Sequence, residues 1–303
     1  MIAGPVVLAG GTGGAKLARG MLDVAGADLT VIVNTADDIE IYGAYVSPDP
    51  DLVTFWLADR IDERGWGLRD DTFAVMEGLR ELGVDVWFSL GDRDLAIGIE
   101  RARRLADGAR LTDAIAELAA ALGVSARVLP MADEPVRTWV QCRAQWRPFQ
   151  EFLIRDGAAG PIQSTSLRGI EEARPTPEIL AAVASASAII IGPSNPVISI
   201  GPILSVPTMR QALLDSPAPI VAVSPIVGGA VLKGPTEAFL RWAGHEADHE
   251  AIAACYEGLI DGLVADGEVD GLPVLRTVTL MDDAESRRRL ASETLRFAQG
   301  LAA

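Results

Sequence analysis

The amino-acid sequence predicts an α/β protein with a doubly wound, mainly parallel sheet of the Rossmann-like type and a small inserted α+β subdomain. Short apolar runs alternate with segments whose apolar residues recur every three or four positions. Continuous apolar runs are typical of parallel strands that helices cover on both faces. The first of them, Val6–Leu8, leads directly into the glycine-rich segment Gly10–Gly14 and then into a helical pattern that opens at Ala15.

The strands and helices follow from these two kinds of pattern. The runs expected to form strands are, in chain order, Val6–Leu8, Thr30–Val33, Val84–Phe88, Ala188–Ile191, Ile220–Val223, Leu263–Ala265 and Val274–Leu275. The helical patterns are Lys16–Val24, Thr72–Leu82, Asp94–Ala106, Leu111–Leu122, Pro177–Ala184, Met209–Leu214, Thr236–Trp242 and Glu285–Leu301, and a further helix should begin near Pro50. Alternation of strand and helix implies a doubly wound sheet with right-handed crossovers.

Residues 126–174 interrupt this alternation. They contain three candidate strands, Arg127–Leu129, Thr138–Cys142 and Phe149–Arg155, with few helical signals. We therefore expect a Rossmann-like core from residues 1–125 and 175–303, and a smaller inserted subdomain from residues 126–174.

Composition excludes several classes of partner. The 303 residues include 26 Lys and Arg against 42 Asp and Glu, a net charge of −16, which would repel a nucleic-acid polymer. A small phosphorylated ligand stays possible, because backbone amides and a bound divalent cation can outweigh a distant charge. Two cysteines are too few for a disulfide framework, and neither a signal peptide nor a membrane-spanning run is expected from the sequence. A cytoplasmic protein without membrane association is expected.

The glycine-rich segment predicts a phosphate site. Four glycines in five residues, Gly10, Gly11, Gly13 and Gly14, separate a strand from a helix, so amide N–H groups should face open space at a positive helix end. Neither standard motif is complete: Lys16 takes the place of the third glycine of the dinucleotide pattern and lacks the neighbours of the NTPase pattern. A glycine turn without a ligand is the alternative.

Small, polar or acidic residues follow five of the expected strands. These segments are Gly10–Gly14, Asn34–Asp38, Ser89–Asp94, Gly192–Pro196 and Ser224–Gly229. In open α/β sheets the ligand crevice lies at the carboxyl ends of the strands. The sequence therefore predicts a single ligand cleft there.

Three carboxylates in these segments are candidates for a hard cation. Asp37, Asp38 and Asp51 could hold Mg²⁺, which takes one or two protein carboxylates and completes its shell with water and phosphate. The alternative is that Asp37 and Asp38 cap a turn and that Asp51 stabilises the start of a helix. If Asp51 is catalytic, Asp51→Asn should reduce turnover far more than stability.

Other polar residues have two interpretations as well. Ser194 and Asn195 lie between two prolines that hold the backbone, so they either bind a ligand or form an Asx turn. Asp94 could serve the cleft or cap its helix. Arg137 and Lys233 are the candidate cations for phosphate charge.

The segment His245–His249 matches the H-E-x-x-H zinc pattern. It contains both histidines of the chain, so no third histidine ligand exists, and solvated helix ends far from the cleft are the expectation. For the same reason no Ser/His/Asp triad is expected. Proton transfer then falls to carboxylates or to the substrate, which suits phosphoryl-type transfer, where positioning and charge neutralisation supply most of the acceleration.

Taken together, these motifs resemble the 2-phospho-L-lactate transferases of coenzyme F-420 biosynthesis. The matching segments, which span nearly the whole chain in order, are Gly10–Leu17, Asn34–Asp38, Ser47–Asp51, Trp66–Gly67, Leu90–Asp94, Met131–Thr138, Phe149–Phe152, Gly192–Ile203, Ser224–Gly229, Lys233–Pro235 and Thr279–Met281.

The resemblance implies a reaction and its partners. The family transfers a phospholactyl-type group from a guanosine diphospho-ester, such as lactyl-2-diphospho-5'-guanosine, to the ribityl hydroxyl of the deazaflavin Fo, with Mg²⁺ and release of GMP. The acyl part of the donor (lactyl, enolpyruvyl or glyceryl) stays open, and a homodimer is expected. The alternative is a nucleotide-sugar-binding regulatory protein of the same fold; the missing third glycine disfavours an NAD(P)-dependent oxidoreductase.

The resemblance also implies roles for individual residues. Those implied for donor phosphate and nucleotide binding are Gly10, Gly11, Thr12, Gly13, Gly14, Lys16, Asn34, Arg137, Gly228 and Lys233. Those implied for Fo binding are Asp51, Ser89, Asp92, Arg93, Ser194 and Asn195. Catalysis and metal binding would fall to Asp37, Asp38 and Asp51.

Overall fold

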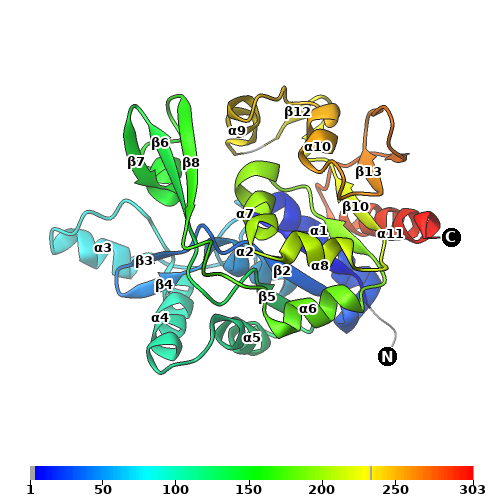
Figure 1. Cartoon of the computed structure of the whole chain (residues 1–303). Coiled ribbons are helices and arrows are strands. Elements are labelled where there is room, and N and C mark those ends of the chain that lie inside the picture. Colours follow the sequence, from blue (N-terminus) through cyan, green and yellow to red (C-terminus); the bar gives the residue numbers. More distant parts are fainter. Residues whose placement is uncertain (1–3, 233, 303) are drawn as a thin grey trace.

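A seven-stranded, wholly parallel sheet forms the centre of the computed structural model, which describes residues 4–232 and 234–302 (Figure 1). The strand order is β14-β13-β10-β9-β1-β2-β5. The strands are β1 (Val6–Ala9), β2 (Thr30–Val33), β5 (Arg127–Pro130), β9 (Ile189–Ile191), β10 (Ile220–Val223), β13 (Gly262–Ala265) and β14 (Val274–Arg276). This confirms the predicted Rossmann-like class.

The strand order reverses at the middle of the sheet. From β1 the chain adds β2 and β5 toward one edge, whereas β9, β10, β13 and β14 extend toward the other edge. The reversal therefore lies between β1 and β9. In open α/β sheets the ligand crevice forms at the carboxyl ends of the strands beside such a reversal.

Helices cover both faces of the sheet. They are α1 (Gly11–Ala25), α2 (Pro48–Leu57), α3 (Ala74–Glu81), α4 (Asp92–Ala106), α5 (Leu111–Ala121), α6 (Pro177–Ala184), α7 (Gly201–Ser205), α8 (Met209–Leu214), α9 (Thr236–Trp242), α10 (His249–Cys255) and α11 (Ala284–Leu301). Among the described residues, none of these helices is long and apolar enough to cross a bilayer.

The hydrophobic core is divided into two layers by the sheet, because successive side chains of a strand point to opposite faces. Val7 and Ala9 of β1 belong to a cluster with residues of α1, α2, α5 and α11. Val6 and Leu8 belong to a second cluster, with residues of α6, α8 and α10. Both faces of the strands are buried, which is why their sequences read as continuous apolar runs.

Helix α1 begins earlier than the sequence indicated. It starts at Gly11 rather than at Ala15, so three of the four glycines lie in its first turn. Gly11 has φ +60°, and a Cβ at Gly13 would lie 2.1 Å from the carbonyl oxygen of Pro193. Glycine is thus required at Gly13 for close packing against the segment that follows β9, and at Gly11 for the turn into the helix.

One predicted strand is wrong. Residues Val84–Phe88 form no strand, and β5 takes the place beside β2 instead. The apolar side chains of Val86 and Phe88 pack against a small cluster with Met76 and Leu90. An apolar run bounded by turns has the same pattern whether it joins a sheet or packs as a loop, so periodicity could not separate the two.

A second, antiparallel sheet stands apart from the centre. Its order is β7-β6-β8, formed by β6 (Arg137–Cys142), β7 (Gln145–Pro148) and β8 (Ile162–Arg168). The strand expected at Arg127–Leu129 lies in the central sheet as β5, and the strand expected at Phe149–Arg155 is a helical turn over Glu151–Arg155. The boundaries of the inserted subdomain stay a prediction.

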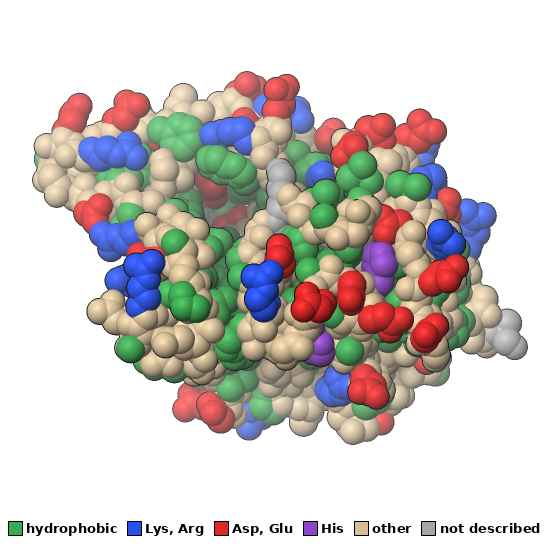
Figure 2. All heavy atoms as spheres, turned by 90° about the horizontal axis from the view of Figure 1, so that it is seen from above, with side chains coloured by type: hydrophobic (Ala, Val, Ile, Leu, Met, Phe, Trp, Pro, Cys, Tyr) green, Lys and Arg blue, Asp and Glu red, His purple; other side chains and the backbone are tan. Residues whose placement is uncertain are grey.

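Two hairpins complete the fold: β3 (Ile39–Ile41) with β4 (Ala44–Val46), and β11 (Ile226–Val227) with β12 (Ala230–Val231). In Figure 1 the antiparallel sheet and the β12–α9 region both lie above the central sheet, the antiparallel sheet on the left and the β12–α9 region to its right. Figure 2, which looks onto this side, shows the surface hollowed, with acidic side chains inside the hollow.

Candidate active site

A cavity of about 1050 Å³ opens at the carboxyl end of the sheet. Ten residues expected at the ligand site line it: Gly10, Gly11, Thr12, Gly13, Lys16, Asp37, Asp51, Ser89, Ser194 and Asn195. Seven others do not: Gly14, Asn34, Asp38, Asp92, Arg93, Arg137 and Gly228. Lys233 lies outside the described residues. The expected cleft at the strand ends therefore exists, and about half of the residues predicted to bind ligands line it.

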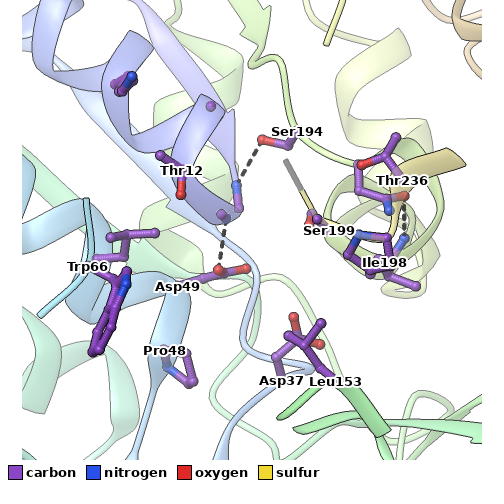
Figure 3. Close-up of a pocket in the computed structure, with 18 of the residues that line it drawn as sticks. Thr12, Asp37, Pro48, Asp49, Trp66, Leu153, Ser194, Ile198, Ser199 and Thr236 are labelled. Atoms are coloured by element: carbon purple, nitrogen blue, oxygen red, sulfur yellow. Dashed lines mark hydrogen bonds between the residues drawn. The ribbon is translucent and has the colours of Figure 1, made fainter. Parts of the chain in front are cut away.

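The start of α1 is held between two polar side chains. The N–H of Gly11 donates to Oδ1 of Asp49 (2.7 Å), and the N–H of Gly10 donates to Oγ of Ser194 (3.2 Å). In Figure 3 Asp49 and Ser194 approach this turn from different sides. A carboxylate at a helix N-terminus marks the place where an anion is favoured.

Asp49 and Asp37 form a buried carboxylate pair. The side-chain amide of Asn34 donates to Oδ2 of Asp49 (2.9 Å) and to Oδ2 of Asp37 (3.1 Å), which brings both carboxyl groups to one side of the cavity floor. Burial raises the pKa of both groups, and Asp49 and then Asp38 raise the pKa of Asp37 further. Two carboxylates taken out of water without a cation between them repel each other, so both bind protons more readily.

The pairing of Asp49 with Asp37 was not foreseen from the sequence. The sequence predicted a functional role for Asp51 of the segment Ser47–Asp51 and none for Asp49. Both acidic residues lie in the first turn of α2. Residues two positions apart on a helix point in different directions. Asp49 consequently faces α1 and Asn34, whereas Asp51 faces α4.

Asp51 forms a buried ion pair with Arg101 of α4. Nη1 of Arg101 donates to Oδ2 of Asp51 (3.1 Å) and to the carbonyl oxygen of Tyr45 (2.9 Å), while Nη2 contacts Oδ1 of Asp51. Arg101 is only 1% exposed. Among the described residues no group of three or more acidic, His or Cys side chains is arranged to hold a metal, so Asp37, Asp38 and Asp51 do not form the expected cluster.

Asp38 lies behind the cavity wall. The hydroxyl of Ser47 donates to its Oδ1 (2.7 Å), and burial raises the pKa of Asp38 to about 7 although Arg137 opposes the shift. Arg137 donates from Nη2 to the hydroxyl of Tyr45 (3.0 Å) and lies over that ring. Arg137 therefore compensates a buried carboxylate and supports the wall.

Asp94 lines the cavity next to the Asp51–Arg101 pair. Burial raises the pKa of Asp94 to about 8, and the charge of Asp51 adds to the shift while Arg101 opposes it. Asp94 does not cap its helix: the N–H groups of Arg93 and Asp94 donate to Asp71. Asp92 in turn accepts N–H bonds from the start of α3, which explains its position away from the cavity.

The cavity has two chemically different ends. What we call the aromatic end contains Phe55, Trp66, Trp87 and Phe88. What we call the hairpin end contains Ser224, Val227, Val231, Leu232 and Thr236. Figure 3 shows Trp66 and Thr236 on opposite sides of the floor formed by Asp37, Asp49 and the start of α1.

The H-E-x-x-H segment is not helical: it joins α9 to α10, which begins at His249 with Asp248 as its N-cap. The zinc motif requires both histidines on one helix face, so it is absent. The expected distance from the cleft, however, is wrong. The His249 ring lies 2.8 Å from Oγ of Ser224, a residue of the hairpin end, and 2.8 Å from Oδ1 of Asp266.

Breaking the Asp51–Arg101 pair should cost stability as well as activity. Asp51→Asn leaves the buried guanidinium without its counter-charge, and we expect a loss of about 3–5 kcal/mol in the free energy of unfolding, measured by urea denaturation. This revises the expectation that turnover would fall far more than stability. Arg101→Met should cost a similar amount, and the double variant much less than the sum. Additive costs would contradict the pairing.

Asp94 should make the stability of the protein depend on pH. Between the usual pKa of 3.8 and about 8, the folded protein keeps a proton on Asp94 that the unfolded chain has released, so stability falls as pH rises through this window. The decrease in Tm from about pH 5 to about pH 8 should be smaller in Asp94→Asn than in the wild type. Asp107→Asn, at an exposed site, is the control and should leave the decrease unchanged. Equal decreases in Asp94→Asn and wild type would contradict the assignment.

Comparison with known proteins shows which family the chain resembles. The family model described as 2-phospho-L-lactate transferase CofD matches residues 6–289. The chain is 38% identical to a 2-phospho-L-lactate transferase from Methanosarcina mazei, over 94% of this chain and 97% of the relative. It is 39% identical to a phosphoenolpyruvate transferase from Kitasatospora aureofaciens, over 97% of each.

A solved structure of a UPF0052-family protein from Bacillus halodurans has the same fold. It aligns with a TM-score of 0.65 at 20% identity, over 97% of this chain and 99% of that one. The family match and the relatives cover nearly the full length, including every segment of the cavity floor. This chain belongs to the 2-phospho-L-lactate transferase family.

Proposed function

We propose that this protein transfers a phospholactyl-type group from a guanosine diphospho-ester to the ribityl hydroxyl of the deazaflavin Fo and releases GMP. The observation that supports it best is the cavity itself: a floor made by a helix N-terminus and two buried carboxylates separates an aromatic end from a hairpin end. The names of the relatives, one a phospholactate and one a phosphoenolpyruvate transferase, leave the acyl group of the donor open.

The two ends suit the two substrates. A flat tricyclic deazaflavin gains most from stacking on aromatic rings, which the aromatic end offers in Trp66, Trp87 and Phe88. The guanosine donor then occupies the hairpin end, and its diphosphate lies over the start of α1. A volume of about 1050 Å³ is at the upper limit for one drug-sized ligand, in keeping with two substrates side by side.

The chemistry is a displacement at phosphorus. The ribityl oxygen forms a bond to the phosphorus that is esterified to the 2-oxygen of lactate or its analogue. The bond from this phosphorus to the bridging oxygen breaks, GMP leaves, and the hydroxyl proton goes to a base. Asp94 is the base in this proposal, because it lines the cavity and burial raises its pKa to about 8, close to neutral pH. Asp51, held by Arg101, orients the hydroxyl.

The carboxylate pair fits a magnesium ion. Oδ1 of Asp37 is buried and has no hydrogen-bond partner among the described residues, and burial raises the pKa of both Asp37 and Asp49. Oxygen ligands of this kind are those that Mg²⁺ prefers. Bound there, the ion would neutralise charge on the diphosphate. The residues that would hold it are Asp37 and Asp49, in place of the set of Asp37, Asp38 and Asp51.

A nucleotide-sugar-binding regulatory protein remains the competing proposal, since a floor that binds a diphosphate would serve it equally. The aromatic end favours the transferase, because a nucleotide-sugar offers no second flat ring system. The homodimer and the cytoplasmic location expected from the sequence also stay predictions.

A transfer assay separates the two proposals. The protein is mixed with Fo, MgCl₂ and, in turn, the lactyl, enolpyruvyl and glyceryl guanosine diphospho-esters, and products are resolved by chromatography with the fluorescence of Fo. We expect one phosphodiester of Fo and one GMP per turnover with at least one donor. No product with any donor, together with no change in Fo fluorescence on titration, would contradict the transferase.

Removing one carboxylate of the pair should weaken magnesium binding. Asp49→Asn keeps the size of the side chain but loses its charge, and we expect Mg²⁺ affinity, measured by calorimetry in the presence of GDP, to fall at least about tenfold. The charge change is the same in Asp107→Asn, at an exposed site directly after α4, which should bind Mg²⁺ like the wild type. Unaltered affinity in Asp49→Asn would show that the ion binds elsewhere.

A further inference from the structure

A Ser–His–Asp array borders the hairpin end of the cavity. Ser224 directly follows β10, His249 is the first residue of α10, and Asp266 directly follows β13. Nδ1 of His249 lies 2.8 Å from Oγ of Ser224, and Nε2 lies 2.8 Å from Oδ1 of Asp266. The side chain of His249 is only 12% exposed, so the ring is held within the protein.

The hydrogen bonds around the ring are satisfied by one neutral tautomer. Oγ of Ser224 already accepts the N–H of Ile226 (3.2 Å), so its own proton is free to be donated to Nδ1 of His249. Nε2 then carries the ring proton and donates to the carboxylate of Asp266. In the opposite tautomer Nε2 and Asp266 would both be acceptors facing each other.

Close packing fixes the position of the ring. A Cβ on Gly267 would lie 2.6 Å from Cδ2 and 3.0 Å from Nε2 of His249. Only a glycine leaves room for the ring between this segment and the end of β10. The contact is specific to His249, since a smaller side chain could not reach both Ser224 and Asp266.

Both partners of the ring also hold the β11–β12 hairpin. Ser224 accepts the N–H of Ile226 at its first strand, and Oδ2 of Asp266 accepts the N–H of Gly228 at its turn (2.6 Å). The hairpin side chains Val227 and Val231 line the cavity. His249 bonds to both Ser224 and Asp266 and so fixes the distance between them. Because these two residues hold the hairpin, His249 determines the position of the hairpin relative to the cavity.

The array does not have the properties of a catalytic triad. Ser224 borders the cavity but is 0% exposed, so its oxygen is closed off from a substrate, whereas a nucleophile must be accessible. Its oxygen accepts the N–H of Ile226, and its own proton is donated to Nδ1 of His249. Ser224 therefore links the hairpin backbone to the His249 ring and has a structural role.

We propose that His249 is a positioning residue for the guanosine donor: as its Nε2–H tautomer it joins Ser224 to Asp266 and holds the β11–β12 hairpin against the hairpin end of the cavity. This inference rests on the proposed function for the identity of the ligand. It concerns the donor alone, because the aromatic end is built from residues of other segments.

Steady-state kinetics of His249→Phe test the proposal. The variant keeps a ring but loses both nitrogen contacts, and we expect KM for the donor to rise about tenfold while kcat and KM for Fo stay within about twofold. His249→Gln, whose amide can still donate to Asp266, should recover part of the loss. His245→Gln, at the other histidine, should behave as the wild type. Equal changes in all three constants, or no change in the donor KM, would overturn the proposal.

A second measurement does not depend on activity or on the folding of His249→Phe. In His245→Gln the His249 ring is the only imidazole of the chain, so its nitrogen signals in a ¹⁵N–¹H spectrum are unambiguous. We expect the Nε2–H tautomer, and a shift of those signals in Gly267→Ala, which displaces the ring. An Nδ1–H tautomer or rapid averaging between tautomers would overturn the array. If the wild type shows no transfer, the proposed function is refuted, and this spectrum still tests the Ser224–His249–Asp266 array on its own.

Discussion

The contact between the first turn of α1 and the segment that follows β9 determines the geometry of the whole cavity. These two segments meet where the strand order reverses, and they approach so closely that a Cβ at Gly13 would overlap the carbonyl oxygen of Pro193. The Gly10 N–H bond to Ser194 depends on that approach, and the Gly11 N–H bond to Asp49 holds the same turn against α2. Without the small residues, the helix end would stand away from the carboxylates it now faces.

The acidic side chains around the cavity differ in how far a neighbouring cation compensates their charge. Asp51 has a full counter-charge in Arg101, and Asp38 is partly compensated by Arg137. Asp37, Asp49 and Asp94 line the same cavity, and burial raises the pKa of each, although Arg101 opposes the shift at Asp94. Buried carboxylates that remain uncompensated cost stability, which is characteristic of sites where a ligand, a metal or a proton completes the charge balance.

The opposite walls of the cavity are built by different means. The aromatic end uses an apolar loop, in which Trp87 and Phe88 stack on each other with ring centres 5.7 Å apart. The hairpin end uses hydrogen bonds that converge on Ser224 and Asp266 from a two-stranded hairpin too small to hold itself in place. A wall of the first kind recognises a flat ring by surface contact, and one of the second kind depends on the few polar groups that anchor it.

The sequence by itself determined the parallel sheet, most of its strands and helices, and the edge at which the ligand cleft lies. These follow from local patterns: apolar runs, three- and four-residue periodicity, and polar residues directly after each strand. It did not separate the loop at Val84–Phe88 from a strand, because both bury the same side chains. Only the tertiary structure decided which charged groups meet. Asp49 reaches Asn34 and Gly11, Arg101 reaches Asp51, and His249 reaches Ser224 and Asp266 across 15 to 50 residues of chain. Such pairs depend on the direction of side chains from separately folded elements, and no spacing in the sequence encodes that direction.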